Sequence, residues 1–142
     1  MSEPGCTFST IAAGTLPAAM VLRDDGAVAF LDAKPVFKGH VLVVPRAHVP
    51  TLAELPAADI GAFFGTVQAI ARAVEAGLGA DGTFVALNNK VSQSVPHLHV
   101  HVIPRRRKDG LRGFFWPRRK YESAEHLSET GIAVRAAVER LR

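Results

Sequence analysis

Three histidines occupy every second position in one short stretch of this chain, SVPHLHVHVIPRRR (residues 94–107): His97, His99 and His101. The residues between and after them are all aliphatic: Leu98, Val100, Val102 and Ile103. Side chains of a β-strand point alternately to two faces, so this pattern predicts a strand with a buried apolar face and an open face that carries the imidazoles. A strand of this kind requires a sheet with a core on one side.

The composition suits one compact domain over residues 1–142. The chain is 48% hydrophobic and 21% charged, and its single cysteine, Cys6, excludes an internal disulfide and a zinc site built from several cysteines of one chain. No apolar run approaches the roughly 20 residues that span a bilayer, and the N-terminus lacks the pattern of a secretory signal. We therefore expect a cytoplasmic protein with no membrane partner.

Several further segments have the character of strands. Short apolar runs at 20–23 and 27–31 flank Asp24-Asp25-Gly26, a hairpin signal, and apolar runs follow at 40–45 and 84–89. With the histidine segment, these runs predict an antiparallel sheet of about five strands.

Two segments have helical spacing instead. Between Pro56 and Leu78 apolar residues recur at intervals of three and four, and Gly77 and Gly79 are candidate stop signals. A second helix is predicted near the end of the chain, with Ser123 as its N-cap. A long central helix, a C-terminal helix and an antiparallel sheet together predict the α+β class.

The three histidines permit three interpretations. They can line a surface by chance, or a His-x-His pair can hold zinc with a third ligand, although no nearby carboxylate pattern completes such a site. We favour direct catalysis by the imidazoles, because histidine near neutral pH can attack phosphorus, donate a proton or bind a phosphate oxygen. The preceding polar loop agrees with this, since Gln93 and Ser94 carry donors for phosphate oxygens, although an ordinary polar loop has the same composition.

The segment after the histidines is basic. The net charge is +4, and eight of the seventeen Lys and Arg residues lie between Arg105 and Lys120. They form either a solvated loop or a surface that attracts phosphate-bearing ligands. Within it, Trp116, with Phe114 and Phe115, can stack on a base, cover a dimer interface or simply pack. Aromatic residues beside arginines also suit single-stranded nucleic acid, but Pro117 and two glycines favour a folded loop, so we expect no nucleic-acid partner.

Two motifs together resemble those of the histidine triad (HIT) superfamily. HLHVHVI matches the signature His-φ-His-φ-His-φ-φ, where φ is apolar. AFLDAKPVFKGHVLVVPRAH (29–48) is similar to a second hallmark, in which Asp or Asn precedes a Gly-His that opens an apolar strand. The resemblance covers about residues 6–108 and implies a HIT-like fold with that core, followed by a basic loop and C-terminal helix at 109–142.

The resemblance implies a role for each matching residue. His99 would attack the α-phosphorus of a nucleotide to form a nucleotidyl-histidine, and the backbone carbonyl of His97 would hold its other ring nitrogen. His101 would contact a phosphate oxygen, with His40 beside the triad. Asp32 would bind ribose hydroxyls. The positions that match phosphate or leaving-group contacts are Asn88, Gln93 and Ser94.

Structural roles remain open for some of these residues. Asp32 can instead cap its loop, and His40 can have only a packing role. The loop NNKVSQS is about two residues shorter than in relatives, which leaves the choice between Asn88 and Asn89 open. Residues that can wall a base pocket or belong to the core are Leu22, Phe30 and Leu42.

The resemblance implies a nucleoside-phosphate hydrolase or nucleotidyl transferase. Its substrates would be dinucleoside polyphosphates, nucleoside phosphoramidates or adenylylated small molecules. The implied ligand is a purine nucleotide, the implied assembly is a homodimer, and no cofactor is required. A nucleotide-binding or scaffold protein with weak or no turnover is the alternative, and a zinc-dependent protein is a third.

A structural zinc ion is not expected. Many bacterial relatives begin with Cys-x-x-Cys, which joins histidines in a zinc site, but here the stretch is Cys6-Thr-Phe-Ser9. His48 and His97 can match the histidines of that site. Serine is a poor zinc ligand, however, so the set is incomplete.

Overall fold

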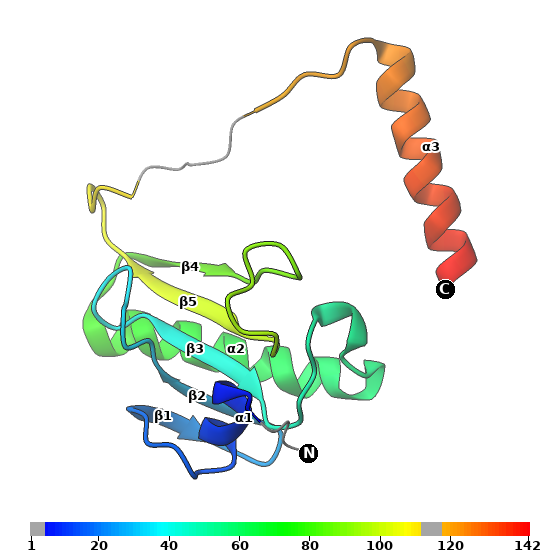
Figure 1. Ribbon diagram of the computed structural model, residues 1–142. Helices are drawn as coiled ribbons and strands as arrows, with labels where there is room; N and C mark the ends of the chain where they lie inside the picture. Colours follow the sequence, from blue (N-terminus) through cyan, green and yellow to red (C-terminus); the bar gives the residue numbers. More distant parts are fainter. Residues whose placement is uncertain (1–4, 112–117) are drawn as a thin grey trace. The chain divides into compact units, whose positions relative to one another are not determined.

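The computed structural model describes residues 5–111 and 118–142 (Figure 1). The chain divides into two compact units, Met1–Asp109 and Gly110–Arg142. The sheet and two α-helices belong to the first unit, and the third α-helix belongs to the second. That the whole chain is a single domain stays a prediction.

The first unit is built on a five-stranded sheet in which every neighbouring pair is antiparallel, in the order β1-β2-β3-β5-β4. Its strands are β1 (Met20–Arg23), β2 (Ala27–Leu31), β3 (Val41–Pro45), β4 (Gly82–Ala86) and β5 (Val100–Arg105). The predicted α+β class and antiparallel sheet are confirmed. The hairpin signal is confirmed as well, because the Asp24 carboxylate accepts hydrogen bonds from the amides of Gly26 and Ala27 at the β1–β2 turn.

The α-helices are α1 (Thr7–Ala12), α2 (Ala57–Leu78) and α3 (Ala124–Leu141), and a 3₁₀ turn, η1, spans Leu52–Glu54. Gly79 ends α2 in the left-handed conformation, with φ of 63°, and Ser123 caps α3 by accepting a hydrogen bond from the His126 amide at 3.0 Å. The signals at Gly79 and Ser123 are therefore confirmed, whereas Gly77 lies within α2 and does not stop it. Sequence reasoning missed α1 and η1, because six and three residues are too few to show a helical period.

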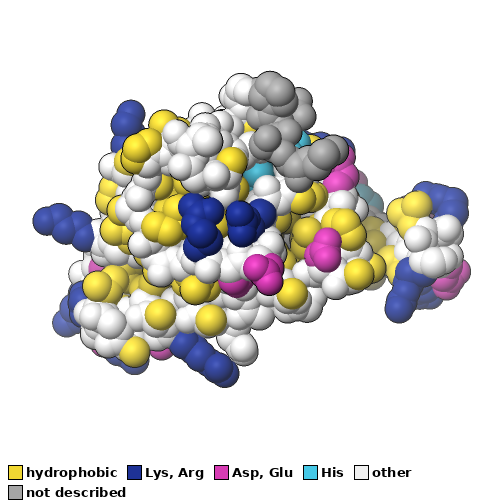
Figure 2. Space-filling model, turned by 90° about the horizontal axis from the view of Figure 1, so that it is seen from below, with side chains coloured by type: hydrophobic (Ala, Val, Ile, Leu, Met, Phe, Trp, Pro, Cys, Tyr) yellow, Lys and Arg dark blue, Asp and Glu magenta, His cyan; other side chains and the backbone are white. Residues whose placement is uncertain are grey.

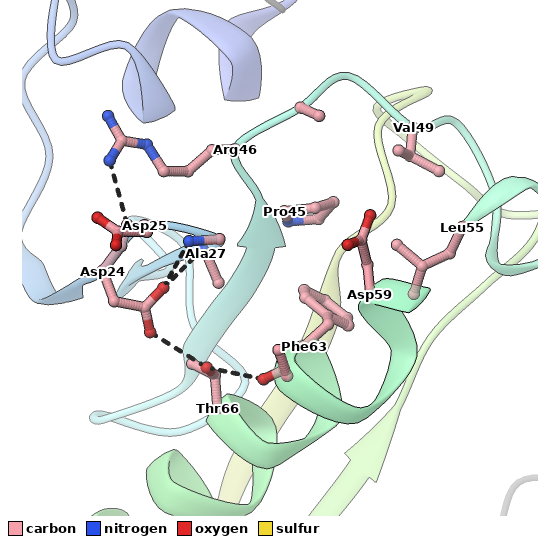
Figure 3. A pocket seen from close by; sticks show the side chains of 13 residues that line it. Asp24, Asp25, Ala27, Pro45, Arg46, Val49, Leu55, Asp59, Phe63 and Thr66 are labelled. Carbon is pink, nitrogen blue, oxygen red and sulfur yellow. Dashed lines mark hydrogen bonds between the residues drawn. The ribbon is translucent and has the colours of Figure 1, made fainter. Parts of the chain in front are cut away.

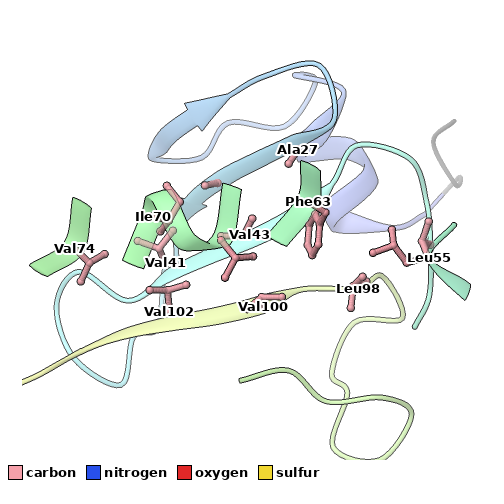
Figure 4. Packing of buried hydrophobic residues seen from close by; sticks show 13 residues of the cluster. Ala27, Val41, Val43, Leu55, Phe63, Ile70, Val74, Leu98, Val100 and Val102 are labelled. Atoms are coloured by element: carbon pink, nitrogen blue, oxygen red, sulfur yellow. The ribbon is translucent and has the colours of Figure 1, made fainter. Parts of the chain in front are cut away.

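Helix α2 covers one face of the sheet and forms the main core with it (Figure 4). From the histidine segment, Leu98, Val100 and Val102 are at most 1% exposed and belong to this core, which confirms the predicted apolar face. From α2, the core receives Phe63, Val67, Ile70 and Val74. Two predicted members of the helix's apolar face, Ile60 and Leu78, are exposed instead.

Helix α1 lies on the opposite face, where a second cluster joins Phe8 and Ile11 to Phe30, Leu42 and Val44 of the sheet. The side chain of His101, in β5, lies on this face, because His101 pairs with Leu42 of β3. The prediction of an open histidine face is wrong, since His97 is 0% and His99 3% exposed. His97 and His99 also precede β5 rather than lying within it.

The second unit contains α3, an amphipathic helix without a buried residue. Its exposed apolar side chains include Leu127, Ile132, Val134, Val138 and Leu141. Within residues 5–111 and 118–142, no helix combines the length and the apolar character that crossing a membrane requires.

Candidate active site

His99 is held in one tautomer by the backbone. Its Nδ1 atom lies 2.7 Å from the carbonyl oxygen of His97. A carbonyl can only accept, so Nδ1 carries the hydrogen and the lone pair of a neutral ring is on Nε2. The ring of Phe8, from α1, packs edge-on against His99 with centroids 5.0 Å apart. In the neutral form, this arrangement leaves Nε2 without a hydrogen on a ring that cannot rotate freely.

His40 and His101 form a second fixed pair. The Val36 amide donates to Nδ1 of His40 at 3.1 Å, and Nε2 of His40 lies 2.9 Å from Nδ1 of His101. Since an amide can only donate, a neutral His40 carries its hydrogen on Nε2 and donates it to His101. His101 then carries its own hydrogen on Nε2, where it can be donated to an anion.

Burial keeps these rings neutral. It lowers the pKa of His101 to about 4, and the nearby His99 and His40 add to this effect. Burial also lowers the pKa of His40, although the carboxylate of Asp32 opposes the change. For His97, burial lowers the pKa while the hydrogen bond to the Pro45 carbonyl opposes it. The tautomers described for His40 and His101 therefore apply at neutral pH.

A cavity of about 510 Å³ lies beside these histidines. Its polar lining includes Asp32, Ser94, His99 and His101, and its apolar wall includes Phe8, Ile11, Phe30 and Leu42. The structure thus brings together four of the predicted site residues and two of the three candidates for the base pocket. The third candidate, Leu22, packs against the core on the α2 face.

Asp32 serves its own loop and also faces the cavity. Its Oδ1 atom accepts the Lys34 amide at 2.9 Å, while Oδ2 lies 3.8 Å from Nδ1 of His40. The loop-capping interpretation and the cavity position are therefore compatible, because capping uses only one of the two carboxylate oxygens.

The loop before the triad is placed differently from the prediction. The side-chain amide nitrogen of Gln93 donates to the Pro50 carbonyl at 2.6 Å. Its side-chain oxygen accepts a hydrogen bond from the backbone amide of Lys90 at 2.9 Å. Asn89 accepts the Leu52 amide at 2.9 Å, and Asn88 is exposed. Among the described residues that line the cavity, neither Asn88 nor Gln93 is present. The hydrogen bonds of Gln93 stabilise the loop instead.

Part of the basic segment has structural partners. Arg105 makes two hydrogen bonds with the Asp109 carboxylate, and Arg106 donates to the carbonyls of Leu78 and Gly79 at the end of α2. On the face shown in Figure 2, Lys and Arg side chains are spread out rather than gathered in one patch. Phe114, Phe115 and Trp116 lie outside the described residues.

A second cavity, of about 500 Å³, lies on the α2 side of the sheet (Figure 3). Phe63, Val49 and Leu55 form its apolar floor, and Asp59 and Arg46 are at its rim. No histidine lines it within the described residues. Of these two cavities, the first is therefore the one that the histidines of the triad line.

Two clusters have the residue types of a metal site. In one, Asp32, His40 and His101 have potential ligand atoms within 4.8 Å of one another, but both ring nitrogens of His40 are already in hydrogen bonds. The other contains Cys6, His48 and His97, also within 4.8 Å. Ser9 completes this second cluster, with its hydroxyl 3.1 Å from Nδ1 of His48 and 3.2 Å from Nδ1 of His97.

Two contributors to the site were missed at the level of sequence. Phe8 contacts His99 from α1, and the Val36 amide orients His40. The phenylalanine lies about ninety residues away in the chain, and every non-proline residue has an amide, so neither contact had a sequence signal.

Relatives with named activities resemble this chain. An adenylylsulfatase (HINT3) from Arabidopsis thaliana is 34% identical over 108 residues, which are 75% of this chain and 55% of that protein. An adenosine 5'-monophosphoramidase (hnt1) from Schizosaccharomyces pombe is 31% identical over 79% of this chain and 83% of its own length. An asymmetrical bis(5'-nucleosyl)-tetraphosphatase from the same yeast is 36% identical over 57% of this chain and 46% of its own.

Solved structures share the fold. A member of the HIT family from Bacillus subtilis superposes with a TM-score of 0.85 at 34% identity, covering 97% of this chain and 98% of that one. A zinc-bound histidine triad family protein from Mycobacterium smegmatis has a TM-score of 0.71 at 35% identity, covering 96% and 95%. The family model of the HIT domain matches residues 13–108. With its histidine triad on an antiparallel sheet, this chain belongs to the HIT family.

Proposed function

We propose that this chain is a nucleoside-phosphate hydrolase or nucleotidyl transferase that acts through a nucleotidyl-His99 intermediate. The observation that carries the proposal is the 2.7 Å contact between Nδ1 of His99 and the His97 carbonyl, beside a cavity that His99 lines. In the neutral ring, this contact leaves the lone pair on Nε2, the nitrogen that can act as the nucleophile.

The reaction divides into two displacements. Nε2 of His99 attacks the α-phosphorus, so that an N–P bond forms while the bond from phosphorus to the leaving group breaks. Water or another acceptor then attacks phosphorus, the N–P bond breaks, and His99 is restored with release of the nucleotide product. The Nε2–H group of His101 can hydrogen-bond to a phosphate oxygen as negative charge develops there. Asp32 can accept hydrogen bonds from ribose hydroxyls.

The cavity and the relatives support a substrate class. The apolar wall formed by Phe30 and Leu42 suits a base, and a purine is our proposal. The named activities of the relatives all concern bonds to a nucleotide phosphorus and differ in the leaving group. Dinucleoside polyphosphates, nucleoside phosphoramidates and adenylylated small molecules are therefore the candidates. The proposal requires no cofactor and includes a homodimer in the cytoplasm.

Trapping the covalent intermediate tests the function. The protein is mixed with adenosine phosphoramidate or diadenosine tetraphosphate, with a chelator present, and samples quenched in alkaline denaturant, which preserves the acid-labile N–P bond, are analysed by mass spectrometry. We expect turnover and the added mass of one adenylyl group. The variant His99→Gly should lose both while still binding nucleotide, and His126→Ala, which changes an exposed histidine in α3, should lose neither. Nucleotide binding without turnover or adduct would instead support the scaffold alternative.

A further inference from the structure

The cluster formed by Cys6, Ser9, His48 and His97 lies behind the catalytic histidines rather than in their cavity. Ser9 is 1% and His97 0% exposed, and Cys6 is 7% exposed. The cluster joins three parts of the chain: α1 with its N-cap Cys6, the loop after β3, and the residue two positions before His99. Because His97 belongs to the cluster, the contacts that fix the cluster also fix the position of the His97 carbonyl.

A metal ion is one way to hold such a cluster, and a similar solved protein is described as zinc-bound. Three of the groups suit zinc, which prefers thiolate and imidazole ligands and takes four in a closed structural site. Here the fourth group is the hydroxyl of Ser9, a neutral oxygen that keeps its hydrogen at neutral pH. The residues present therefore do not fit a closed structural zinc site.

The hydrogen bonds show what the hydroxyl does instead. Nε2 of His97 lies 2.8 Å from the Pro45 carbonyl, so it carries the ring hydrogen and Nδ1 is an acceptor. The Ser9 hydroxyl, 3.2 Å away, can donate to that Nδ1 and accept from Nδ1–H of His48 at 3.1 Å. The Cys6 sulfur, 3.6 Å from the same nitrogen of His97, accepts the Ser9 amide at 3.4 Å. Among the described residues, no buried side-chain nitrogen or oxygen lacks a hydrogen-bond partner.

We propose that Ser9 is a metal-free clamp: its hydroxyl ties α1 to His48 and His97 in place of a metal ion and thereby positions His99. The link runs through two contacts. The His97 carbonyl holds Nδ1 of His99, and Phe8, next to Ser9 on α1, packs against the His99 ring. Ser9 itself is not among the residues that line the cavity, so it is a positioning residue.

Three variants separate a clamp from an incomplete metal site. In Ser9→Ala the two rings lose their shared partner, so we expect a lower Tm and a fall in kcat of roughly tenfold, the size of one lost buried hydrogen bond, with little change in KM. Ser9→Cys should bind one zinc ion per chain, regain the Tm, and become sensitive to chelator. The matched control is Thr10→Ala, which removes a neighbouring hydroxyl that bonds only to the Cys6 carbonyl and should leave kcat unchanged.

Three measurements do not depend on turnover. Elemental analysis of the purified protein should find substoichiometric metal, and its Tm should not change with chelator. Long-range ¹H–¹⁵N spectra should show His99 with its hydrogen on Nδ1, and in Ser9→Ala the Nε2–H tautomer should gain population. The effect on kcat rests on the proposed function, whereas metal content, Tm and tautomer do not. Stoichiometric zinc in the unaltered protein, or an unchanged His99 tautomer in a folded Ser9→Ala, would overturn the clamp.

Discussion

Nε2 of His40 lies 2.9 Å from Nδ1 of His101, and the Val36 amide fixes the direction of the hydrogen bond between them. The Val36 amide donates to the buried ring of His40, and His40 in turn donates to His101, which lines the cavity. His101 therefore has its hydrogen on Nε2 without being charged. This relation gives His40, which is 2% exposed, a role beyond packing that can be measured.

Replacing His40 with leucine should remove the donor to His101. We expect kcat to fall by roughly 10–100-fold, the size of a weakened acid–base contribution, because His101 no longer favours the Nε2–H tautomer. Steady-state kinetics and ¹⁵N spectra of the His101 ring measure the two effects. Val36→Ala keeps the backbone amide at an exposed position and should retain kcat. Full activity of His40→Leu would remove His40 from the mechanism.

The lowered pKa of His101 predicts how stability depends on pH. In the unfolded chain this ring binds a proton near pH 6.5, whereas burial in the folded chain lowers its pKa to about 4. Between these values the unfolded state holds more protons, so the free energy of unfolding should fall as the pH drops from 6.5 to 4, by roughly 3 kcal/mol for this ring.

Urea denaturation at several pH values measures this slope. His101→Gln should flatten it, while His126→Gln, at an exposed histidine, should leave it unchanged. An equally steep slope in His101→Gln would show that other groups cause the loss.

Truncating Leu98 should destabilise the protein, although Leu98 does not line the cavity beside the histidines. Leu98 is 0% exposed and packs in the α2-side core, so Leu98→Ala leaves a cavity and should cost about 2–5 kcal/mol of unfolding free energy. The urea midpoint should fall with an unchanged m-value. Val91→Ala, in a loop and 79% exposed, should change the free energy by less than about 0.5 kcal/mol. A similar cost at both positions would contradict this account of the core.

Gly39 and Gly61 should respond to alanine with opposite signs. Gly39 has φ of +98°, which a residue with a Cβ rarely adopts, and the exposed tip of Leu78 would also have to move, so Gly39→Ala should destabilise by roughly 1–3 kcal/mol and disturb the adjacent His40. Gly61 lies in α2 with no atom near an added Cβ, so Gly61→Ala should stabilise by about 0.5–1 kcal/mol. Thermal unfolding of both variants compares them directly, and a stable Gly39→Ala would argue against the strained turn.

The sequence by itself predicted the sheet, the helices α2 and α3, and the candidate residues of the site. Alternation of histidine with aliphatic residues predicted the core-facing Leu98, Val100 and Val102, and helical spacing predicted α2, because both patterns repeat within a few residues. Gly79 and Ser123 marked helix ends for the same local reason. The resemblance to the HIT superfamily added the candidate roles.

Only the tertiary structure decided how the candidate site is assembled. Helix α1, too short to show a period, covers the histidine face and brings Phe8 and Ser9 to His99 and His97. The tautomers depend on backbone carbonyls and amides from distant segments, and such groups have no sequence signature. The loop that was expected to place Gln93 at a phosphate instead directs it to Pro50. Contacts between distant segments arise from packing, which local patterns do not encode.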